Sequence, residues 1–202
     1  AWVIGDVPGW FTGVKMPLPP HPEKFANQRA SLTAFVNHPG APERFVLAND
    51  DMYVIEPAPA HLPAYRNKNP LSGWVDAERS ERRLNAWHRA VIATAEWVAD
   101  KTGTDPYIYE CHVPLMFHTA TFRDLINAYP ADRPFAAGEL YPLAGCGAAA
   151  GHAGNAKCGK ADSLAAKLAN PMPFLSSSPD TWPGVVADHV KPLFPDPSPW
   201  EV

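Results

Sequence analysis

The sequence is short of the features that mark secreted, membrane-spanning and nucleic-acid-binding proteins. It has three cysteines, an odd and sparse set that fits a reducing cytoplasm better than a disulfide framework. No apolar run approaches the roughly 20 residues of a membrane span, and the first residues lack the basic region of a signal peptide. The net charge is -4 and no block of Lys and Arg stands out. We therefore expect a cytoplasmic protein whose main partner is not nucleic acid.

What the sequence does contain indicates a folded chain. It has 202 residues, of which 46% are hydrophobic, enough for a substantial core. Its 24 prolines are interleaved with seven tryptophans and nine phenylalanines, whereas disordered chains lack aromatic residues. We therefore expect the prolines to stiffen loops and residues 1–202 to form a single α/β domain.

The most informative stretch is residues 44–55. The apolar residues 45–48 are typical of a strand buried on both faces at the centre of a parallel sheet. Asn49, Asp50 and Asp51 follow at once, where open α/β sheets bind ligands beyond the ends of their strands. Two adjacent carboxylates are costly unless a cation neutralises them, and a hard divalent cation prefers oxygen ligands. The alternative is a plain turn, because Asn and Asp are common turn formers.

Strand and helix patterns alternate along the chain. A strand at 2–5, a helix at 23–36 and a strand at 45–48 give the βαβ order of a parallel sheet. The clearest helix is predicted at 77–101, where apolar residues recur every three or four positions and Gly103 supplies the stop. Shorter elements are also predicted: helices at 121–129 and 161–169, a strand that begins at Phe174, and a last helix that Asp180 caps and that ends at Val190.

Two further segments supply candidate ligand-binding groups. Residues 107–117 are β-prone, and a spacing of two puts Glu110 and His112 on the same face of a strand. A neighbouring carboxylate and imidazole can bind a metal, relay protons or simply hydrogen-bond each other, and these alternatives stay open. In the loop predicted at 63–73, Tyr65 and Arg66 are polar candidates for contacting a ligand.

Residues 138–160 are rich in Gly and Ala, and we expect them to form an irregular loop. They carry Cys146, His152 and Cys158 at intervals of six. A zinc site is one interpretation, but the spacing matches no common zinc pattern and a fourth ligand is not evident. A loop at the active site is the interpretation we favour.

Five separated blocks of the sequence carry a resemblance to a known family. They are Trp2-Val3-Ile4-Gly5-x-x-Pro8-x-Trp10, Lys24-Phe25-x-Asn27, Phe45-Val46-Leu47-x-Asn49-Asp50-Asp51-Met52-Tyr53, Glu110-x-His112-x-Pro114 and Ser176-Ser177-Ser178-x-Asp180. In this order they resemble the Stealth sugar-phosphate transferases, and still more the short glycosyltransferase-like proteins of actinobacterial phages. The resemblance covers nearly the whole chain. The Asn-Asp-Asp block is its most specific part, followed by Glu110-x-His112.

The resemblance implies a GT-A-like, Rossmann-like α/β fold with a mostly parallel sheet flanked by helices. The family's opening βα unit contacts the nucleotide base and has no counterpart ahead of Trp2, so the implied fold is trimmed or that unit lies upstream. By the same resemblance, Asp50 and Asp51 would hold Mn²⁺ or Mg²⁺ against a diphosphate. His112 would be a further metal ligand or an acid–base group, with Glu110 beside it, and the catalytic residues would be Asp51, His112 and Glu110.

The remaining implied roles concern the substrate. Asn49 would orient the sugar or a metal-bound water, while Lys24, Asn27 and Arg29 would line the nucleotide or sugar side. The implied activity is a metal-dependent glycosyltransferase that moves a sugar from a nucleotide-sugar donor to a protein or glycan acceptor, in the host cytoplasm if the protein is phage-encoded. The alternatives are a sugar-1-phosphate transferase with the same metal site, and a non-catalytic carbohydrate-binding protein, for which tryptophans suit sugar stacking.

Overall fold

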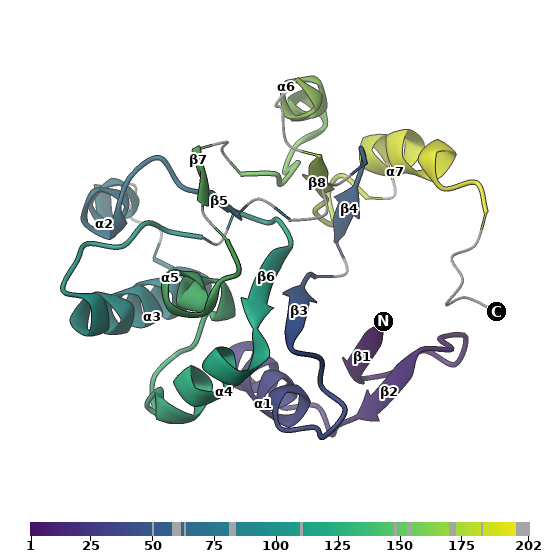
Figure 1. Cartoon of the computed structure of the whole chain (residues 1–202). Helices are drawn as coiled ribbons and strands as arrows, with labels where there is room; N and C mark the ends of the chain where they lie inside the picture. Colours follow the sequence, from purple (N-terminus) through teal and green to yellow (C-terminus); the bar gives the residue numbers. More distant parts are fainter. Residues whose placement is uncertain are drawn as a thin grey trace.

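The computed structural model describes residues 1–49, 51–57, 62, 64–80, 84–109, 111–147, 149–152, 155–169, 173–182 and 184–196. Figure 1 shows a mixed α/β fold in which β3, β6, β4 and β8 lie near the middle of the view with helices around them. The helices are α1 (Lys24–Val36), α2 (Leu71–Ser80), α3 (Ala86–Thr102), α4 (Thr119–Ala128), α5 (Tyr141–Ala144), α6 (Leu164–Leu168) and α7 (Val185–Val190), with 3-10 turns η1 (Ala137–Leu140), η2 (Ala161–Ser163) and η3 (Lys191–Leu193). The strands are β1 (Trp2–Gly5), β2 (Val14–Pro17), β3 (Arg44–Leu47), β4 (Met52–Val54), β5 (Ala64–Arg66), β6 (Leu115–His118), β7 (Ala149–His152) and β8 (Phe174–Ser176). None of the described helices combines the length and the apolar character that crossing a membrane requires.

The described strands pair two by two and do not form the mostly parallel sheet that the sequence predicts. The pairs β1–β2 and β5–β7 are parallel, while β3–β6 and β4–β8 are antiparallel. The predicted order of strand, helix and strand is present as β1, α1 and β3. In the described part of the chain, however, β1 pairs with β2 and β3 with β6. A local apolar pattern predicts that a strand exists, but its partner is decided by contacts between distant segments.

β3 is not buried on both faces, as its apolar sequence predicts. Val46 leaves 46% of its surface exposed. Phe45 lies on the buried face, where its ring meets Phe35 and Phe122 edge-on and stacks on Phe117. The antiparallel pairing with β6 is the physical reason for the difference, because an antiparallel pair can face the core on one side and water on the other.

Two helices form close to where the sequence predicts them. α1 begins directly after Glu23, whose carboxylate accepts hydrogen bonds from the backbone N–H groups of Phe25 and Ala26. α4 covers the helix predicted at 121–129 and buries Phe122. These two helices pack against each other beside the β3–β6 pair (Figure 1).

The single helix predicted at 77–101 is two helices, because α3 starts afresh at Ala86. Asn85 caps it: the Asn85 side chain accepts from the His88 N–H, and the His88 ring accepts from the Asn85 N–H. This capping box satisfies backbone donors that an uninterrupted helix would satisfy internally. The predicted stop is confirmed, since Gly103 ends α3 in the left-handed conformation with φ of 66°.

The segments on either side of α2 and α3 differ from the predictions. The loop predicted at 63–73 contains β5 and the start of α2. Residues 107–117 are a strand only from Leu115 onward, and His112 lies before that strand with φ of 54°, a left-handed conformation that strands do not use. Glu110 lies outside the described residues, so the predicted strand face shared by Glu110 and His112 is not part of the described structure.

Residues 138–160 are not the irregular loop that the sequence predicts. They include most of η1, all of α5 and β7, and core positions such as Leu140, Ala144 and Ala156. Cys158 is completely buried and packs in an apolar cluster with Leu175 in β8. Small side chains let the backbone of this segment approach its neighbours closely, which a loop prediction based on Gly and Ala content does not anticipate.

The C-terminal elements agree with the predictions except at one helix end. β8 begins at Phe174 as predicted, and the helix predicted at 161–169 is η2 followed by α6. The last helix ends at Val190 as predicted, but it begins at Val185 with Gly184 at its N-terminal cap. The prediction that Asp180 caps this helix is therefore wrong.

Candidate functional site

Asp51 lies directly ahead of β4, where that strand meets β8. Met52 in β4 faces Ser176 in β8, and the Ser177 N–H donates to the Asp51 carbonyl at 2.9 Å. The pairing therefore brings the predicted metal ligand Asp51 beside the serine-rich block that follows Leu175 in the sequence.

Residues 155–158, the 155–158 segment, run along β8. Lys157 forms a parallel bridge with Ser176. The Ser176 N–H donates to the Ala156 carbonyl at 3.1 Å, and the Cys158 N–H donates to the Ser176 carbonyl at 2.7 Å. Since Ala156 and Cys158 are buried and side chains alternate along an extended chain, Lys157 lies on the opposite, less buried side.

His112 reaches the same place from another part of the chain. The Ala156 N–H donates to the carbonyl of Cys111, the residue before His112, at 3.0 Å. The backbone hydrogen bonds thus join four separate segments of the chain. We call the four residues that they gather, Asp51, His112, Lys157 and Ser176, the Asp51–His112 site.

The electrostatic surroundings of His112 keep its ring neutral near pH 7. Burial is the main cause that lowers the pKa of His112 to about 4. The Lys157 ammonium lowers this pKa further, as does Lys24 at the start of α1, while Asp51 and the Asn155 side chain act in the opposite direction. A neutral imidazole keeps a lone pair for a metal ion or a hydrogen-bond donor. The His112 backbone also has a positive φ, and such uncommon conformations cluster at functional sites.

Three buried polar atoms in this site lack hydrogen-bond partners. They are Asp51 Oδ1, His112 Nδ1 and Ser176 Oγ, and no other buried side-chain oxygen or nitrogen in the described residues has this property. Most buried polar atoms in proteins are satisfied, and leaving one unsatisfied costs about 1–3 kcal/mol. All three atoms belong to residues of the Asp51–His112 site, where a ligand that reached them would complete their hydrogen bonding.

The site fits a divalent cation only in part. The Asp51 carboxylate and the neutral His112 ring are suitable ligands. However, the described residues contain no group of three or more His, Cys, Asp or Glu side chains that could hold an ion, and Asp50 and Glu110 lie outside them. Lys157 and Lys24 act on His112 as well and repel a cation. The described residues therefore fit Mn²⁺ or Mg²⁺ when an anionic ligand supplies further oxygens.

Asn49 and Met52 are joined by local contacts. The Met52 N–H donates to the Asn49 carbonyl at 3.2 Å, and the Asn49 N–H approaches Met52 Sδ at 3.5 Å. The chain therefore turns here, but in the described residues β3 pairs with β6 and β4 with β8, so the turn is not that of a hairpin between β3 and β4. Ligand binding by Asp51 stays a prediction. Asn49 also lines a cavity of about 530 Å³ between β1, α1 and β3.

Of the residues predicted on the nucleotide or sugar side, Lys24 is the one with an electrostatic influence on the Asp51–His112 site. Its charge acts on His112, and its side chain is exposed. Asn27 has a local role, since its side-chain oxygen accepts from the His21 N–H at 2.9 Å. This bond holds the turn ahead of α1 and gives Asn27 a structural explanation.

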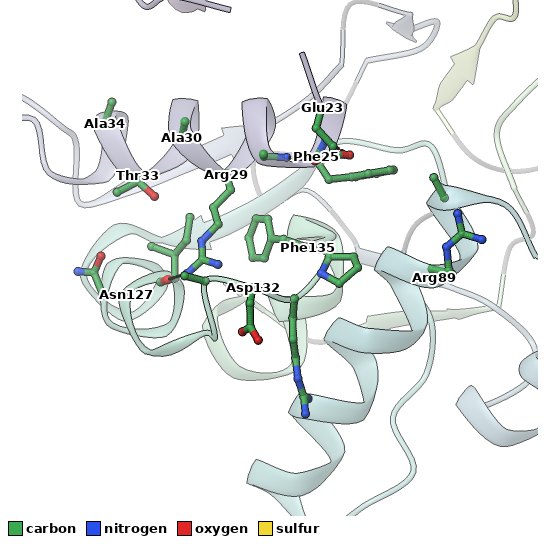
Figure 2. A pocket seen from close by; sticks show the side chains of 16 residues that line it. Glu23, Phe25, Arg29, Ala30, Thr33, Ala34, Arg89, Asn127, Asp132 and Phe135 are labelled. Atoms are coloured by element: carbon green, nitrogen blue, oxygen red, sulfur yellow. Dashed lines mark hydrogen bonds between the residues drawn. The ribbon is translucent and has the colours of Figure 1, made fainter. Parts of the chain in front are cut away.

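Arg29 joins α1 to the end of α4. Its guanidinium donates to the carbonyls of Ile126, Tyr129 and Pro130 at 3.1, 2.5 and 2.7 Å. It also lies over the ring of Phe135. Figure 2 shows Arg29 reaching across a groove of about 1010 Å³ toward Phe135. We call this the Arg29 groove; it is lined by residues of α1, α3, α4 and the segment 131–135.

The side chains of Tyr65 and Arg66 pack against aromatic rings. Tyr65 is buried and meets the Phe174 ring edge-on, and burial raises the pKa of its hydroxyl. The Arg66 guanidinium lies over the Tyr107 ring, 3.3 Å from its centre. Within the described residues, neither side chain hydrogen-bonds, pairs or stacks with the residues of the Asp51–His112 site.

An aromatic group borders the site. The Trp87 ring lies 6.4 Å from the His112 ring, and it also meets Trp74 and His88 edge-on. The other nitrogen of the His88 ring, Nε2, lies 3.1 Å from a carboxylate oxygen of Glu78. Trp87 is only partly buried, so this group offers an aromatic surface next to His112.

The sequence analysis missed the contributions of Lys157, Asn155 and Trp87. The first two lie in the segment predicted as a loop, and no spacing signal connects them to residues a hundred positions away. Trp87 lies within the helix predicted at 77–101, where the apolar spacing gave no reason to expect a contact with His112. Ser176 had a signal, the serine-rich block, although the block alone did not indicate a role.

Known families and proteins do not add to this description. No protein-family model matches the sequence, and no curated protein matches it significantly. A functional conclusion for this chain therefore rests on the chemistry of the Asp51–His112 site.

Proposed function

We propose that the protein is a metal-dependent glycosyltransferase that moves a sugar from a nucleotide-sugar donor to a protein or glycan acceptor, with the donor diphosphate at the Asp51–His112 site. The observation that carries the proposal is that three residues of this site each bury a polar atom without a partner, Asp51 Oδ1, His112 Nδ1 and Ser176 Oγ. A carboxylate and a neutral imidazole suit a divalent cation, and a serine hydroxyl suits a phosphate oxygen. The lysines beside them suit the same anion.

The proposed chemistry builds charge where these groups lie. Breaking the bond between a sugar and a diphosphate leaves negative charge on the diphosphate, and preorganised positive groups stabilise that charge. A bound Mn²⁺ or Mg²⁺ would supply Lewis-acid stabilisation of the leaving group. Asp51 and His112 would hold the ion, and Lys24 would contribute its charge from the start of α1.

Between the two roles open for His112, the surroundings favour the metal ligand. Its pKa is lowered to about 4, so the ring is a weak base near pH 7 and a poor acceptor for the proton of a sugar or serine hydroxyl. The same lowering keeps the ring deprotonated, which metal binding requires. Trp87 beside it offers a face on which a sugar or base can stack.

The GT-A-like arrangement belongs to this proposal as well. The mixed α/β fold and the position of Asp51 directly ahead of β4 support it, while the two antiparallel strand pairs are a departure from a mostly parallel sheet. The proposal therefore rests on the site more than on the topology.

A thermal-shift panel tests the donor site directly. UDP-, GDP-, ADP- and dTDP-sugars are each added with and without Mn²⁺. A ligand at 100 times its dissociation constant adds roughly 2.7 kcal/mol to the free energy of unfolding, which is roughly 5–10 °C for a chain of this size. We expect one nucleotide class to raise the melting temperature in a Mn²⁺-dependent way, and Asp51→Asn to abolish the rise. Asp124→Asn on the exposed side of α4 is the matched control.

Product analysis then identifies the reaction. Mass spectrometry of the acceptor after incubation with the stabilising donor should show an added sugar. An added sugar phosphate would replace the proposal by sugar-1-phosphate transfer. Saccharide binding that needs neither Mn²⁺ nor Asp51 would replace it by a non-catalytic carbohydrate-binding protein.

A further inference from the structure

The 155–158 segment holds Lys157 in a fixed place beside β8. Both neighbours of Lys157 are buried and bonded to Ser176 on the two sides of the parallel bridge. Asn155 adds a further contact to the Lys157 backbone, because its side-chain oxygen accepts a hydrogen bond from the Lys157 N–H at 2.8 Å. The fixed backbone keeps the base of the Lys157 side chain beside β8, and its flexible four-carbon stem extends from there.

That ammonium group has no ionic partner in the described residues. Among the described residues, the contact at ion-pair distance is that of His88 with Glu78, and no described carboxylate pairs with Lys157. Its charge acts instead on the buried His112 ring, as does that of Lys24, and Asp51 is the one described carboxylate whose charge acts there against them. Two cations thus face one anion among the described groups, next to the completely buried Ser176 with its unpartnered hydroxyl.

We infer that Lys157, with the Ser176 hydroxyl as a second donor, binds a diphosphate at this junction. This inference deepens the proposed function and rests on it for the identity of the ligand. A diphosphate offers acceptor oxygens for an ammonium and a hydroxyl, and its charge also relieves the repulsion between the lysines and a metal ion. Metal and diphosphate therefore bind cooperatively, and by linkage each raises the affinity of the other by the same factor.

In the transfer reaction Lys157 acts on the leaving group. The bond between the anomeric carbon and the diphosphate oxygen breaks, and its electron pair stays on that oxygen. The acceptor hydroxyl oxygen forms the new bond to the anomeric carbon, and its proton passes to water. The Lys157 ammonium stabilises the charge that appears on the diphosphate, so its effect on rate exceeds its effect on donor binding in the ground state.

Calorimetric titration of the full chain with inorganic pyrophosphate tests the inference without any assumption about sugar or nucleotide. The metal-free titration compares wild type, Lys157→Met and Lys157→Arg. Lys160→Met is the matched control, since Lys160 is exposed on the same stretch of chain. We expect Lys157→Met to weaken binding about tenfold or more, because a hydrogen bond to a charged group is worth about 1.5–3 kcal/mol. Lys157→Arg should retain most of the affinity, and Lys160→Met should behave as wild type.

The outcomes separate this inference from the proposed function. If wild type does not bind pyrophosphate, or if Lys157→Met binds it as tightly as Lys160→Met, the inference is overturned, even if the protein transfers a sugar. If Lys157-dependent binding is found but no donor yields a transfer product, the diphosphate site stands and the proposed function fails. Where transfer is measured, a fall in kcat for Lys157→Met larger than the rise in KM supports the role at the leaving group.

Discussion

The Asp51–His112 site and the Arg29 groove differ in what their polar groups already contact. In the groove, the Arg29 guanidinium donates to three carbonyls at the end of α4. In the site, Asp51, His112 and Ser176 each bury a polar atom without a partner. The groove has a volume of about 1010 Å³, yet the Arg29 guanidinium in it already holds α1 against the end of α4.

The contrast teaches that size and charge alone do not locate a ligand site. A buried group with satisfied hydrogen bonds has a structural explanation, whereas one left unsatisfied needs another. Carbonyls at a helix C-terminus lack intrahelical donors, so an arginine that reaches them stabilises the fold. Three unsatisfied atoms at the junction of distant segments gain nothing in the protein alone and become useful only with a ligand.

The largest effect we expect is a pH dependence of stability that belongs to His112. Its pKa is lowered to about 4 in the folded protein, so the unfolded chain binds a proton more readily. Its contribution to stability is therefore complete above about pH 6.5 and is lost as the pH falls from there toward 4, by about 3 kcal/mol in all. Urea unfolding of wild type and His112→Gln between pH 7 and 4.5 measures this.

The difference between the two proteins isolates His112, because the carboxyl groups titrate in both. We expect wild type to lose free energy of unfolding more steeply than His112→Gln in this window. If the free energy of unfolding falls equally with pH in both proteins, His112 is not held in a buried, cationic environment. The site would then not differ from the groove in the way described above.

Arg29→Met should come next, with a loss of about 2 kcal/mol in the free energy of unfolding, since three carbonyls lose a charged donor. For a chain of this size the melting temperature falls by roughly 4–8 °C. Donor-induced stabilisation and pyrophosphate affinity should be unchanged in the folded protein. Arg89→Met is the matched control in the same groove, where the exposed Arg89 makes one such bond, to Leu84. A loss of ligand binding in Arg29→Met would place substrate in the groove.

The smallest effect we expect is that of Thr181, which hydrogen-bonds to the 155–158 segment. The Thr181 hydroxyl donates to the Cys158 carbonyl at 2.8 Å and accepts from the Ser178 N–H at 2.9 Å. Thr181→Val should cost about 1 kcal/mol of stability and weaken pyrophosphate binding, because the 155–158 segment loses an anchor. Thr33→Val, in the Arg29 groove, is the control that should leave binding intact. Equal binding by both variants would mean that Lys157 does not need this anchor.

Local features of this protein could be read from its residues. Glu23 ahead of α1, Gly103 after α3 and the apolar positions of α4 each encode a helix boundary or face within a few residues. The acidic stretch at Asp51 was identified because a carboxylate after an apolar run is unusual enough to need an explanation. Where the local signals competed, as at Asn85, the cap prevailed over the apolar period.

Strand pairing and the composition of the site were decided by the tertiary structure. β3 has the apolar sequence of a central strand, but its partner β6 leaves Val46 exposed. The 155–158 segment is held beside His112 by the hydrogen bond from the Ala156 N–H to the Cys111 carbonyl, which joins residues more than forty positions apart. No apolar period or sequence motif predicts a contact of this kind. The sequence determined which side chains could do chemistry and where helices begin and end, because those are short-range properties. Which of these side chains meet, and which are left without partners, follows from packing between distant segments.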